Sequence, residues 1–323
     1  MTSGKVGAKS LNLAKLRQLS GDFTVLGGVA LPFGTFQYLL SRCPQIKSSM
    51  TALLNKLTND NCKEIFREIR DLISQMEMPE EFEHVITRTA AENGLLKIAE
   101  KFNVNTAWQA MLGVYKSMFE LRPWTSLQKG HFIYFCKIFI ISGRIAFAQL
   151  NMAVQPAEVQ PADYSFVVHT RNPFKNNSDE MLIEVVPGLG EVLVGSYPGR
   201  AMSVTVKRSD PASISVISYP SKSVKLCSHG GLIFRSDSNS EDLCGFAGAG
   251  LFESVTTDPA VTAGNVFSED MLVTDSSLRA KLLGRICVMA LKVEEFFSDV
   301  PQDIEGVVTV NGELVVVQSR PQV

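Results

Sequence analysis

The sequence predicts a mixed α/β protein whose first half carries a long helical segment. Three observations predict this class. Apolar residues recur at helical spacing between residues 46 and 122, short apolar and β-branched runs begin near residue 165, and the chain ends in a hairpin pattern at 302–323. With 323 residues, the chain can form two domains or one two-lobed unit with a large core.

The composition limits the classes of function. A net charge of -2 argues against a general nucleic-acid or membrane-surface role, because a polyanion would not attract the chain as a whole. The longest apolar run, 132–141, is broken by Lys137 and is shorter than the roughly 20 residues that cross a bilayer. The six cysteines show no CxxC or Cys/His pairing, which predicts reduced thiols without a disulfide framework or a zinc site. The N-terminus lacks the apolar stretch of a secretory signal.

Residues 4–19 predict a loop followed by a helix, with Gly7 shortly before Lys9. The apolar positions of this helix are Leu11, Leu13, Leu16 and Leu19. At a helix N-terminus, the Lys9 ammonium and the free amides can bind phosphate. The alternative is a solvated lysine beside an amphipathic helix, and the residues alone do not decide between the two. Residues 27–40 then predict a short strand, a Pro-Phe-Gly turn and the start of a helix.

Residues 46–122 predict helices with charged faces between the apolar positions. His84 has no neighbour that suggests a ligand role, so we interpret it as structural. We expect Trp108 and Trp124 to lie in the core. The segment 131–147 is biased toward aromatic residues and isoleucine, which suggests a lineage-specific insertion or translated intron sequence. Transcript sequencing that keeps these codons would exclude the second hypothesis.

Short strands are predicted from residue 152 onward. Pro156 and Pro161 disfavour a central strand there, because each removes a backbone donor. Residues 165–171 predict a strand, and 181–204 predict a strand, a helix start at the GLGE string and a second strand. Glu184 lies on the first strand of this segment, and both a ligand contact and a structural capping role remain open for it.

The stretch 232–255 combines an apolar run, a cation and a polar loop. The apolar residues 232–234 precede Arg235, and the serine-rich residues that follow favour turns. The glycines that would let backbone approach an anion are Gly245, Gly248 and Gly250. The acids of this loop, candidates for loop closure or metal support, are Asp237, Glu241 and Asp242. The alternative is a solvated Arg235 on a flexible surface loop.

The C-terminal segment predicts a helix over 278–297 and then a β-hairpin around the Asn311-Gly312 turn. In this hairpin Glu305 can lie opposite Gln318, with Arg320 on the same face. A carboxylate and an amide oxygen are suitable ligands for Mg²⁺, and an arginine beside them can offset phosphate charge. The alternative is an exposed polar face of the hairpin.

These strings, in their order, resemble the nucleotide-binding domain of the α-glucan water dikinases, which are relatives of pyruvate phosphate dikinase and phosphoenolpyruvate synthase. The matching strings are VGAKSLNLAKL, EVVPGLGEVLVGSYPGRA, RSDSN, GFAGAG, and the C-terminal QDIEG and VVVQSRP. Arg235 follows the GLGE string, an order shared with the α-glucan water dikinases. The resemblance is lost over 123–150.

The resemblance implies a two-lobed, ATP-grasp-like α/β nucleotide-binding unit with a helical insert in its first lobe. Residues 1–150 and 215–260 would form the first lobe, and residues 151–214 and 261–323 the second. ATP would lie between them. The implied phosphate-binding cations are Lys9, Arg235 and Arg320, the last two with a catalytic role. Glu184 would lie near the nucleotide, and Glu305 and Gln318 would hold Mg²⁺.

In the family, the β-phosphate of ATP passes to a histidine on a separate domain and then to an α-glucan, and the γ-phosphate passes to water. The four histidines, none of which lies in a string like the phosphohistidine motif, are His84, His131, His169 and His229. His169 matches the family only as a strand residue. We therefore hypothesise that the chain binds Mg-ATP but needs an added histidine domain to phosphorylate starch or another α-glucan. Plastid and cytoplasm are both open as compartments.

Two further classes of function are considered. The prolines at 156 and 161 and the segment 131–147 suggest a degenerate nucleotide-binding or scaffold module without catalysis. An ATP-grasp carboxylate–amine ligase would require an acyl-acceptor pocket, and no sequence feature demands one. Titration with ATP separates the first of these from an active dikinase domain.

Overall fold

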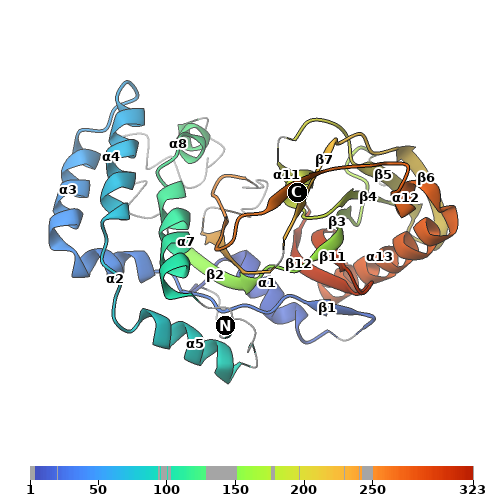
Figure 1. Ribbon diagram of the computed structural model, residues 1–323, viewed down its shortest axis with the longest axis horizontal. Coiled ribbons are helices and arrows are strands. Elements are labelled where there is room, and N and C mark those ends of the chain that lie inside the picture. The colour runs from blue at the N-terminus through green and yellow to red at the C-terminus, as the bar shows by residue number, and fades with distance from the viewer. Residues whose placement is uncertain are drawn as a thin grey trace.

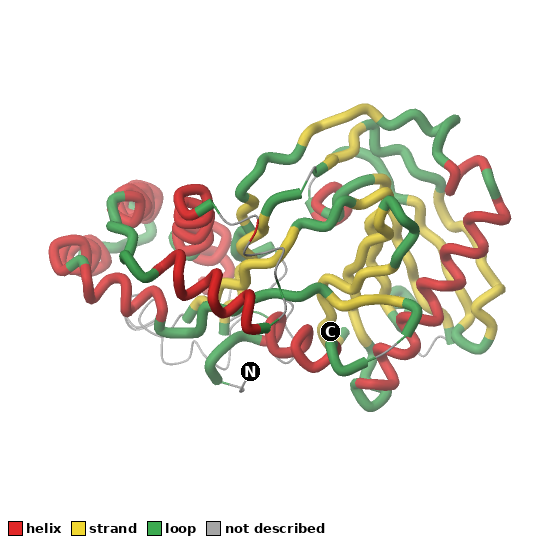
Figure 2. Tube along the Cα trace, turned by 60° about the horizontal axis from the view of Figure 1, so that its bottom comes forward, coloured by secondary structure: helices red, strands yellow, loops and turns green. Residues whose placement is uncertain are grey.

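The computed structural model describes residues 4–19, 21–93, 95, 100, 103–128, 151–175, 179–195, 197–228, 230–239, 241 and 250–322. Within them the protein is a mixed α/β structure, as predicted, with helices at one end and strands at the other (Figures 1 and 2). The predictions for segment 131–147, and for Asp242, Gly245 and Gly248, lie outside the described residues.

The chain divides into a mainly helical first part and a strand-rich second part. The helices of the described residues are α1 (Ala8–Leu16), α2 (Thr35–Arg42), α3 (Pro44–Asn55), α4 (Cys62–Ser74), α5 (Phe82–Glu92), α7 (Val104–Ser117), α8 (Leu121–Gln128), α11 (Glu191–Val194), α12 (Met271–Thr274) and α13 (Ser276–Phe296). The strands are β1 (Phe23–Val25), β2 (Met152–Glu158), β3 (Ala162–His169), β4 (Glu180–Pro187), β5 (Met202–Lys207), β6 (Asp210–Ser218), β7 (Val224–Cys227), β8 (Leu232–Ser238), β9 (Val255–Thr256), β10 (Val261–Gly264), β11 (Gln302–Thr309) and β12 (Leu314–Pro321).

Helices α2 to α5, α7 and α8 form the helical part on the left of Figure 1. Their apolar residues fall on one face of each helix; in α4, for example, Ile65, Ile69 and Ile73 are buried. Trp108 and Trp124 belong to this core, as predicted. His84 is exposed on α5.

A seven-stranded sheet with the order β1-β12-β11-β3-β4-β5-β6 forms the other part. Only β1 runs parallel to its neighbour, β12, and the other pairs are antiparallel. One face is covered by the long helix α13, seen beside the strands in Figure 2. Its buried Leu283, Ile286 and Ala290 share a core with inward residues of the sheet such as Ile183 and Ile304. Because strand side chains alternate, the intervening residues of β3, β4, β11 and β12 point to the opposite face.

A three-stranded sheet, β2-β8-β9, joins the helical part to the large sheet. Met152 and Val154 of β2 pack into the helical core, whereas Leu13 of α1 and Phe23 of β1 pack into the core beneath α13. Segment β2 comes from the expected second lobe but packs with the helical part. Segments α1 and β1 come from the expected first lobe but pack with the large sheet.

Pro156 is accommodated because β2 lies at the edge of its sheet. The Pro156 carbonyl accepts a hydrogen bond from the Val29 amide at 3.0 Å, but proline has no N–H to return. Residues 28–31 consequently form only isolated bridges with β2, Gly28 to Ala157 and Leu31 to Val154. The predicted conflict between proline and a central strand is thus avoided.

The C-terminal hairpin forms as predicted, with Gly312 at a φ of 76° in its turn and its amide donating to the Thr309 carbonyl at 2.8 Å. A β-bulge interrupts the pairing after Glu305, because Glu305 pairs with Gln318 and Gly306 pairs with Val316. Val317 is the extra residue of this bulge. Its carbonyl is therefore free to bind a group outside the sheet.

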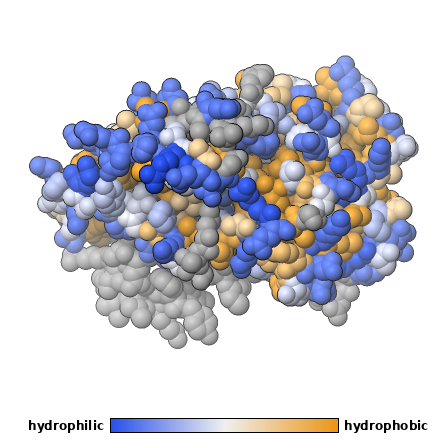
Figure 3. All heavy atoms as spheres, turned by 90° about the horizontal axis from the view of Figure 1, so that it is seen from below, coloured by the Kyte–Doolittle hydropathy of each residue, from blue (hydrophilic) through white to orange (hydrophobic). Residues whose placement is uncertain are grey.

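Seen from below (Figure 3), hydrophobic residues gather over the right-hand half of the molecule. On the α13 side of the large sheet, a groove of about 450 Å³ contains Phe23, Val288, Met289 and Leu314. Lys281, Arg285 and Lys292 also line it. This groove lies on the side of the sheet away from the polar face described below.

Candidate functional site

The open face of the large sheet carries a row of mostly polar side chains. Directly paired residues of antiparallel strands point to the same face. The row consists of Gln318, Glu305, Val167, Glu184 and Ser203, in the order of strands β12, β11, β3, β4 and β5. At about 4.8 Å per strand, this row spans roughly 19 Å. The predicted opposition of Glu305 and Gln318 is present in the register.

Glu184 lies two strands from Glu305, next to Ser203 at the other end of the row. Its Oε1 accepts a hydrogen bond from Ser203 Oγ at 3.0 Å. A cavity of about 340 Å³ opens at this end, lined by Glu184, Arg200 and Lys222 among others. The structure therefore places Glu184 at a polar cavity and gives it a hydrogen-bond partner on the neighbouring strand β5.

Arg235 joins β8 to the hairpin. Its Nη1 donates to the Val317 carbonyl at 2.5 Å and its Nη2 to Gln318 Oε1 at 2.6 Å. The residue is only 9% exposed, so the alternative of a solvated surface arginine is wrong. Burial lowers the pKa of Arg235, while the carboxylates of Glu305, Asp237 and Glu241 act in the opposite direction. Arginine remains charged in proteins, so Arg235 is a fixed cation among these acids.

Lys9 is held by acids from the segment around β8. Its Nζ donates to Glu241 Oε1 at 2.8 Å and to the Ser236 carbonyl at 3.0 Å. The amides of Lys9 and Ser10 donate to the two carboxylate oxygens of Asp237, each at 3.1 Å. Burial raises the pKa of Asp237, and the amide hydrogen bonds act in the opposite direction. The N-terminus of α1 is therefore capped by a carboxylate from a distant strand.

The capping by Asp237 was missed in the sequence, although one signal was present. Gly7 occupies the N-cap position and has no side chain that can accept the first amides. Those amides must find an acceptor elsewhere, because helix N-termini leave unsatisfied donors. The absent side chain at Gly7 also lets α1 approach β8 closely.

Gly7→Ala is expected to lower the free energy of unfolding by about 1–3 kcal/mol, the usual cost of overpacking. A Cβ at this position would lie 2.1 Å from Asp237 Oδ1 and 2.9 Å from its main-chain oxygen, so helix and strand must move apart. Urea unfolding measures the change. Gly264→Ala is the control, because a Cβ there meets nothing within 4 Å. An equal effect of both substitutions would contradict the expectation.

Arg320 lies one step along the same face from Gln318, and its partner is Asp303. Arg320 Nε and Nη2 both donate to Asp303 Oδ2, at 3.0 and 2.7 Å. Asp303 also pairs in register with His169, and His169 Nδ1 lies 3.5 Å from Asp303 Oδ1. Sequence reasoning missed both neighbours of Arg320, although the two-residue spacing from Asp303 to Glu305 already puts these acids on one face.

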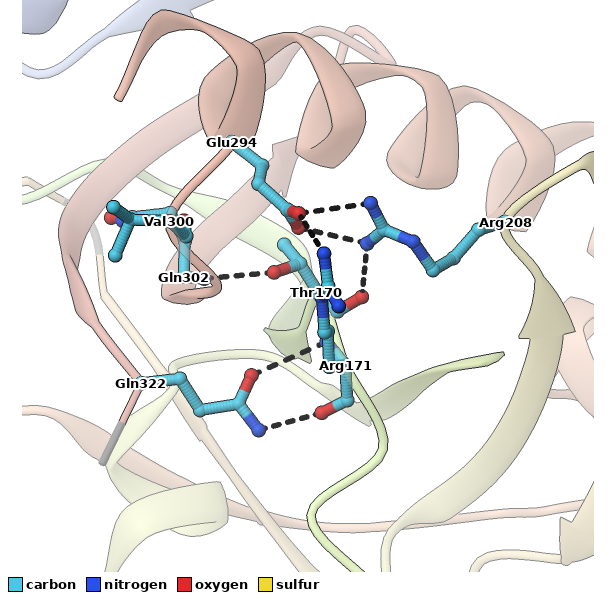
Figure 4. Close-up of polar contacts among 7 residues, drawn as sticks. All are labelled: Thr170, Arg171, Arg208, Glu294, Val300, Gln302 and Gln322. Atoms are coloured by element: carbon cyan, nitrogen blue, oxygen red, sulfur yellow. Dashed lines mark hydrogen bonds and ion pairs between the residues drawn. The ribbon is translucent and has the colours of Figure 1, made fainter. Parts of the chain in front are cut away.

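An ionic network around the buried Glu294 holds the ends of the strands beside His169 (Figure 4). Glu294, from α13, accepts two hydrogen bonds from Arg208 at 2.8 Å each, and Arg171 Nη2 lies 3.5 Å away. Arg208 also donates to the Thr170 carbonyl at 2.6 Å. The main-chain amide of Gln302 donates to Thr170 Oγ1 at 2.8 Å. The network therefore fixes the strand ends next to His169 and Asp303.

Comparison with known proteins places this chain in a family. Residues 95–323 match the family model described as "Pyruvate phosphate dikinase, AMP/ATP-binding domain". The chain belongs to this family. It is 37% identical to the chloroplastic alpha-glucan water dikinase of Citrus reticulata over 99% of this chain. It is 36% identical to alpha-glucan water dikinase 2 of Arabidopsis thaliana over 100% of this chain. The chloroplastic enzyme of Solanum tuberosum is 36% identical over 99% of the chain.

The predicted resemblance to the α-glucan water dikinases is thereby confirmed, and the family description supports ATP as a ligand. The chain spans 21–24% of the length of these curated relatives. Two of the three are named chloroplastic. Within the described residues, no helix has the length and apolar character that crossing a membrane requires.

For a pyruvate phosphate dikinase-type domain, the donor set at Glu305 and Gln318 fits Mg²⁺. Both supply hard oxygens, and the two residues are directly paired. Gln318 Oε1 accepts one hydrogen bond from Arg235, which leaves a second lone pair. Magnesium commonly takes few protein ligands and completes its shell with phosphate oxygens and water. No group of three or more His, Cys, Asp or Glu side chains forms a metal cluster within the described part of the chain.

Proposed function

We propose that this chain is the Mg-ATP-binding domain of an α-glucan water dikinase. One observation carries the proposal: Arg235 of β8 is bonded to Gln318 of the hairpin, opposite Glu305, while Lys9 is bonded to the residues that follow Arg235. Cations from distant parts of the chain thus lie close to a carboxylate and an amide oxygen. Phosphoryl transfer needs mainly such positioned charge around the phosphates, with little covalent work by the protein.

In this proposal, the fold is a two-lobed, ATP-grasp-like unit with ATP lying across the polar face of the large sheet. Lys9, Arg235 and Arg320 hold the phosphates, and the two arginines offset the charge that develops during transfer. Glu305 and Gln318 hold Mg²⁺, which neutralises phosphate charge when bound. Glu184 lies two strands from Glu305, roughly 10 Å away, on the nucleoside side.

The lobes are proposed as residues 1–150 with 215–260, and 151–214 with 261–323. Segments α1, β1 and β2 hold the lobes together. The first two belong to the first lobe and pack into the core of the second, and β2 belongs to the second lobe and packs into the core of the first. This interlocking puts Lys9, at the start of α1, against β8 and close to the hairpin.

The acceptors are proposed from the names of the relatives, which specify a glucan and water. The β-phosphate of ATP would pass to a histidine on a separate domain and from there to starch or another α-glucan, in the plastid or the cytoplasm. We expect glucan phosphorylation only when a histidine domain is added to the chain. Phosphate transfer to glucan by the chain alone would contradict this division of labour.

Glu305→Gln is expected to weaken Mg-ATP binding by about 10-fold or more, because a charged contact contributes about 1.5–3 kcal/mol. Calorimetric titration measures the affinity, and chelation of Mg²⁺ should lower the affinity of the unmodified chain toward that of the variant. Glu313→Gln is the matched control, since Glu313 is an exposed carboxylate on the same hairpin. An unchanged affinity in Glu305→Gln would contradict the assigned role.

A second candidate is a nucleotide-binding module that has lost catalysis and serves as a scaffold. The observation that favours it is the occupation of Lys9 and of the first amides of α1 by Glu241 and Asp237, groups that would compete with phosphate. Negligible heat on titration of the unmodified chain with Mg-ATP would favour this candidate. Saturable binding would favour the dikinase domain.

A further inference from the structure

His169 and Asp303 form a pair on the polar face beside Arg320. Their Nδ1 and Oδ1 atoms lie 3.5 Å apart, and both atoms are buried without a hydrogen bond to other described residues. The His169 side chain is 24% exposed, and its Nε2 makes no hydrogen bond to the described residues. The ring therefore turns its Nδ1 edge toward the carboxylate and leaves its Nε2 edge open.

This arrangement prepares Nε2 to accept a proton or a hydrogen bond. A carboxylate next to Nδ1 favours the tautomer that carries its hydrogen on Nδ1, which leaves a lone pair on Nε2. The second oxygen of Asp303 holds Arg320 through two hydrogen bonds. One carboxylate thus orients both a phosphate-binding cation and a hydrogen-bond acceptor.

The pair also lies at the correct end of the proposed site. The row of Arg320, Asp303 and His169 is two residues along the strands from the row of Gln318 and Glu305, which is roughly 7 Å. Glu184 is on the same face, on strand β4, two residues along from Leu182, which pairs with His169. Arg320 is thus two strands from His169, with Asp303 between them, and three strands from Glu184 at the proposed nucleoside end.

A purely structural role accounts poorly for these features. A buried polar atom without a hydrogen bond destabilises the folded state, and here two such atoms face each other. An apolar side chain would fill a strand position next to Val168 without that cost. Costs of this kind are typical of functional sites.

We propose that His169 is a catalytic residue that orients the water attacking the terminal phosphate and accepts its proton. This inference rests on the proposed function. The water oxygen forms a bond to the terminal phosphorus, and the bond from that phosphorus to the bridging oxygen breaks. The bridging oxygen stays with the remaining phosphate, the water proton passes to Nε2, and inorganic phosphate leaves. Water is a weak nucleophile, so its orientation is a recurrent task in phosphoryl transfer.

The test compares ADP with ADP plus aluminium fluoride, both with Mg²⁺. The fluoroaluminate stands in for a phosphoryl group between the leaving oxygen and an attacking water. We expect the unmodified chain to bind ADP at least about tenfold more tightly with aluminium fluoride, as transition-state analogues do. His169→Ala should keep the affinity for ADP and lose most of this gain. His84→Ala, which removes an exposed histidine of α5, should behave like the unmodified chain.

The outcomes separate this inference from the proposed function. If the unmodified chain binds neither ATP nor ADP, the proposed function fails and the inference fails with it. If ADP binds but aluminium fluoride adds nothing, or if His169→Ala keeps the full gain, only the inference is overturned. Thermal melting checks the fold of the variant. Should His169→Ala unfold, His169→Gln replaces it, and the same loss of gain at unchanged ADP affinity is expected.

Discussion

Glu294→Ala is expected to lower the free energy of unfolding by about 3–5 kcal/mol, the cost of removing one partner of a buried ion pair. The Glu294 side chain is 1% exposed and faces both Arg208 and Arg171. Its removal leaves two cations next to each other without a counter-charge. Urea unfolding measures the loss. Glu295→Ala, an exposed carboxylate of the same helix, is the control and should change stability little.

The contribution of Glu294 to the free energy of unfolding should also depend on pH. Burial acts to raise the pKa of Glu294, but the hydrogen bonds from Arg208 and Thr170 outweigh burial and hold the pKa below its ordinary value. A depressed pKa in the folded state means that the stabilisation is complete above the unfolded pKa of about 4.3 and is lost as pH falls through the folded value. The difference between the unmodified chain and Glu294→Ala should therefore shrink in acid. A difference that stays constant from pH 7 to pH 3 would contradict this.

Arg235→Met is expected to weaken Mg-ATP binding by about 10- to 100-fold, because hydrogen bonds to charged groups contribute about 1.5–3 kcal/mol. The substitution removes the fixed cation beside Glu305 and leaves Val317 and Gln318 without their donor. The Mg-ATP affinity of Arg235→Lys should lie between that of the unmodified chain and that of Arg235→Met, since lysine keeps the charge but lacks the two-pronged donor geometry. Calorimetry with Mg-ATP measures the affinities.

Arg279→Met is the matched control for Arg235. Arg279 also donates to main-chain carbonyls, those of Leu272 and Val273, but on the far side of the large sheet near α12. Arg235 is buried and Arg279 is partly buried, and thermal melting checks the fold of both variants. If Arg235→Met binds Mg-ATP as tightly as Arg279→Met, the phosphate role of Arg235 is wrong.

The hairpin and the helices could be predicted because their signals are local. The Asn311-Gly312 turn and the period of two place Glu305 opposite Gln318, and the structure has this pair, although the pairing nearer the turn is shifted by one residue at the bulge. The spacing of Ile65, Ile69 and Ile73 predicts the buried face of α4 in the same way. Each signal involves residues that are neighbours within one element, where the geometry of the backbone decides which side chains share a face.

The partners of the candidate site could not be predicted, because they come from different elements. Lys9 and Glu241 are 232 positions apart, and no local pattern couples them. Residues around His169 predict a strand, but its Asp303 neighbour follows only from the pairing of β3 with β11. The burial of Arg235 likewise depends on the docking of β8 against the bulge at Val317.

The sequence by itself determined the mixed α/β class, the helical character of residues 46–122 and 278–297, the pairing of Glu305 with Gln318 and the kinds of polar group available. The tertiary structure alone decided which of those groups meet: Asp237 with the first amides of α1, Arg235 with Gln318, and Asp303 with both Arg320 and His169. The reason is physical. Backbone periodicity acts over a few residues, whereas a buried charge takes whichever partner the packing of distant elements brings within hydrogen-bonding distance.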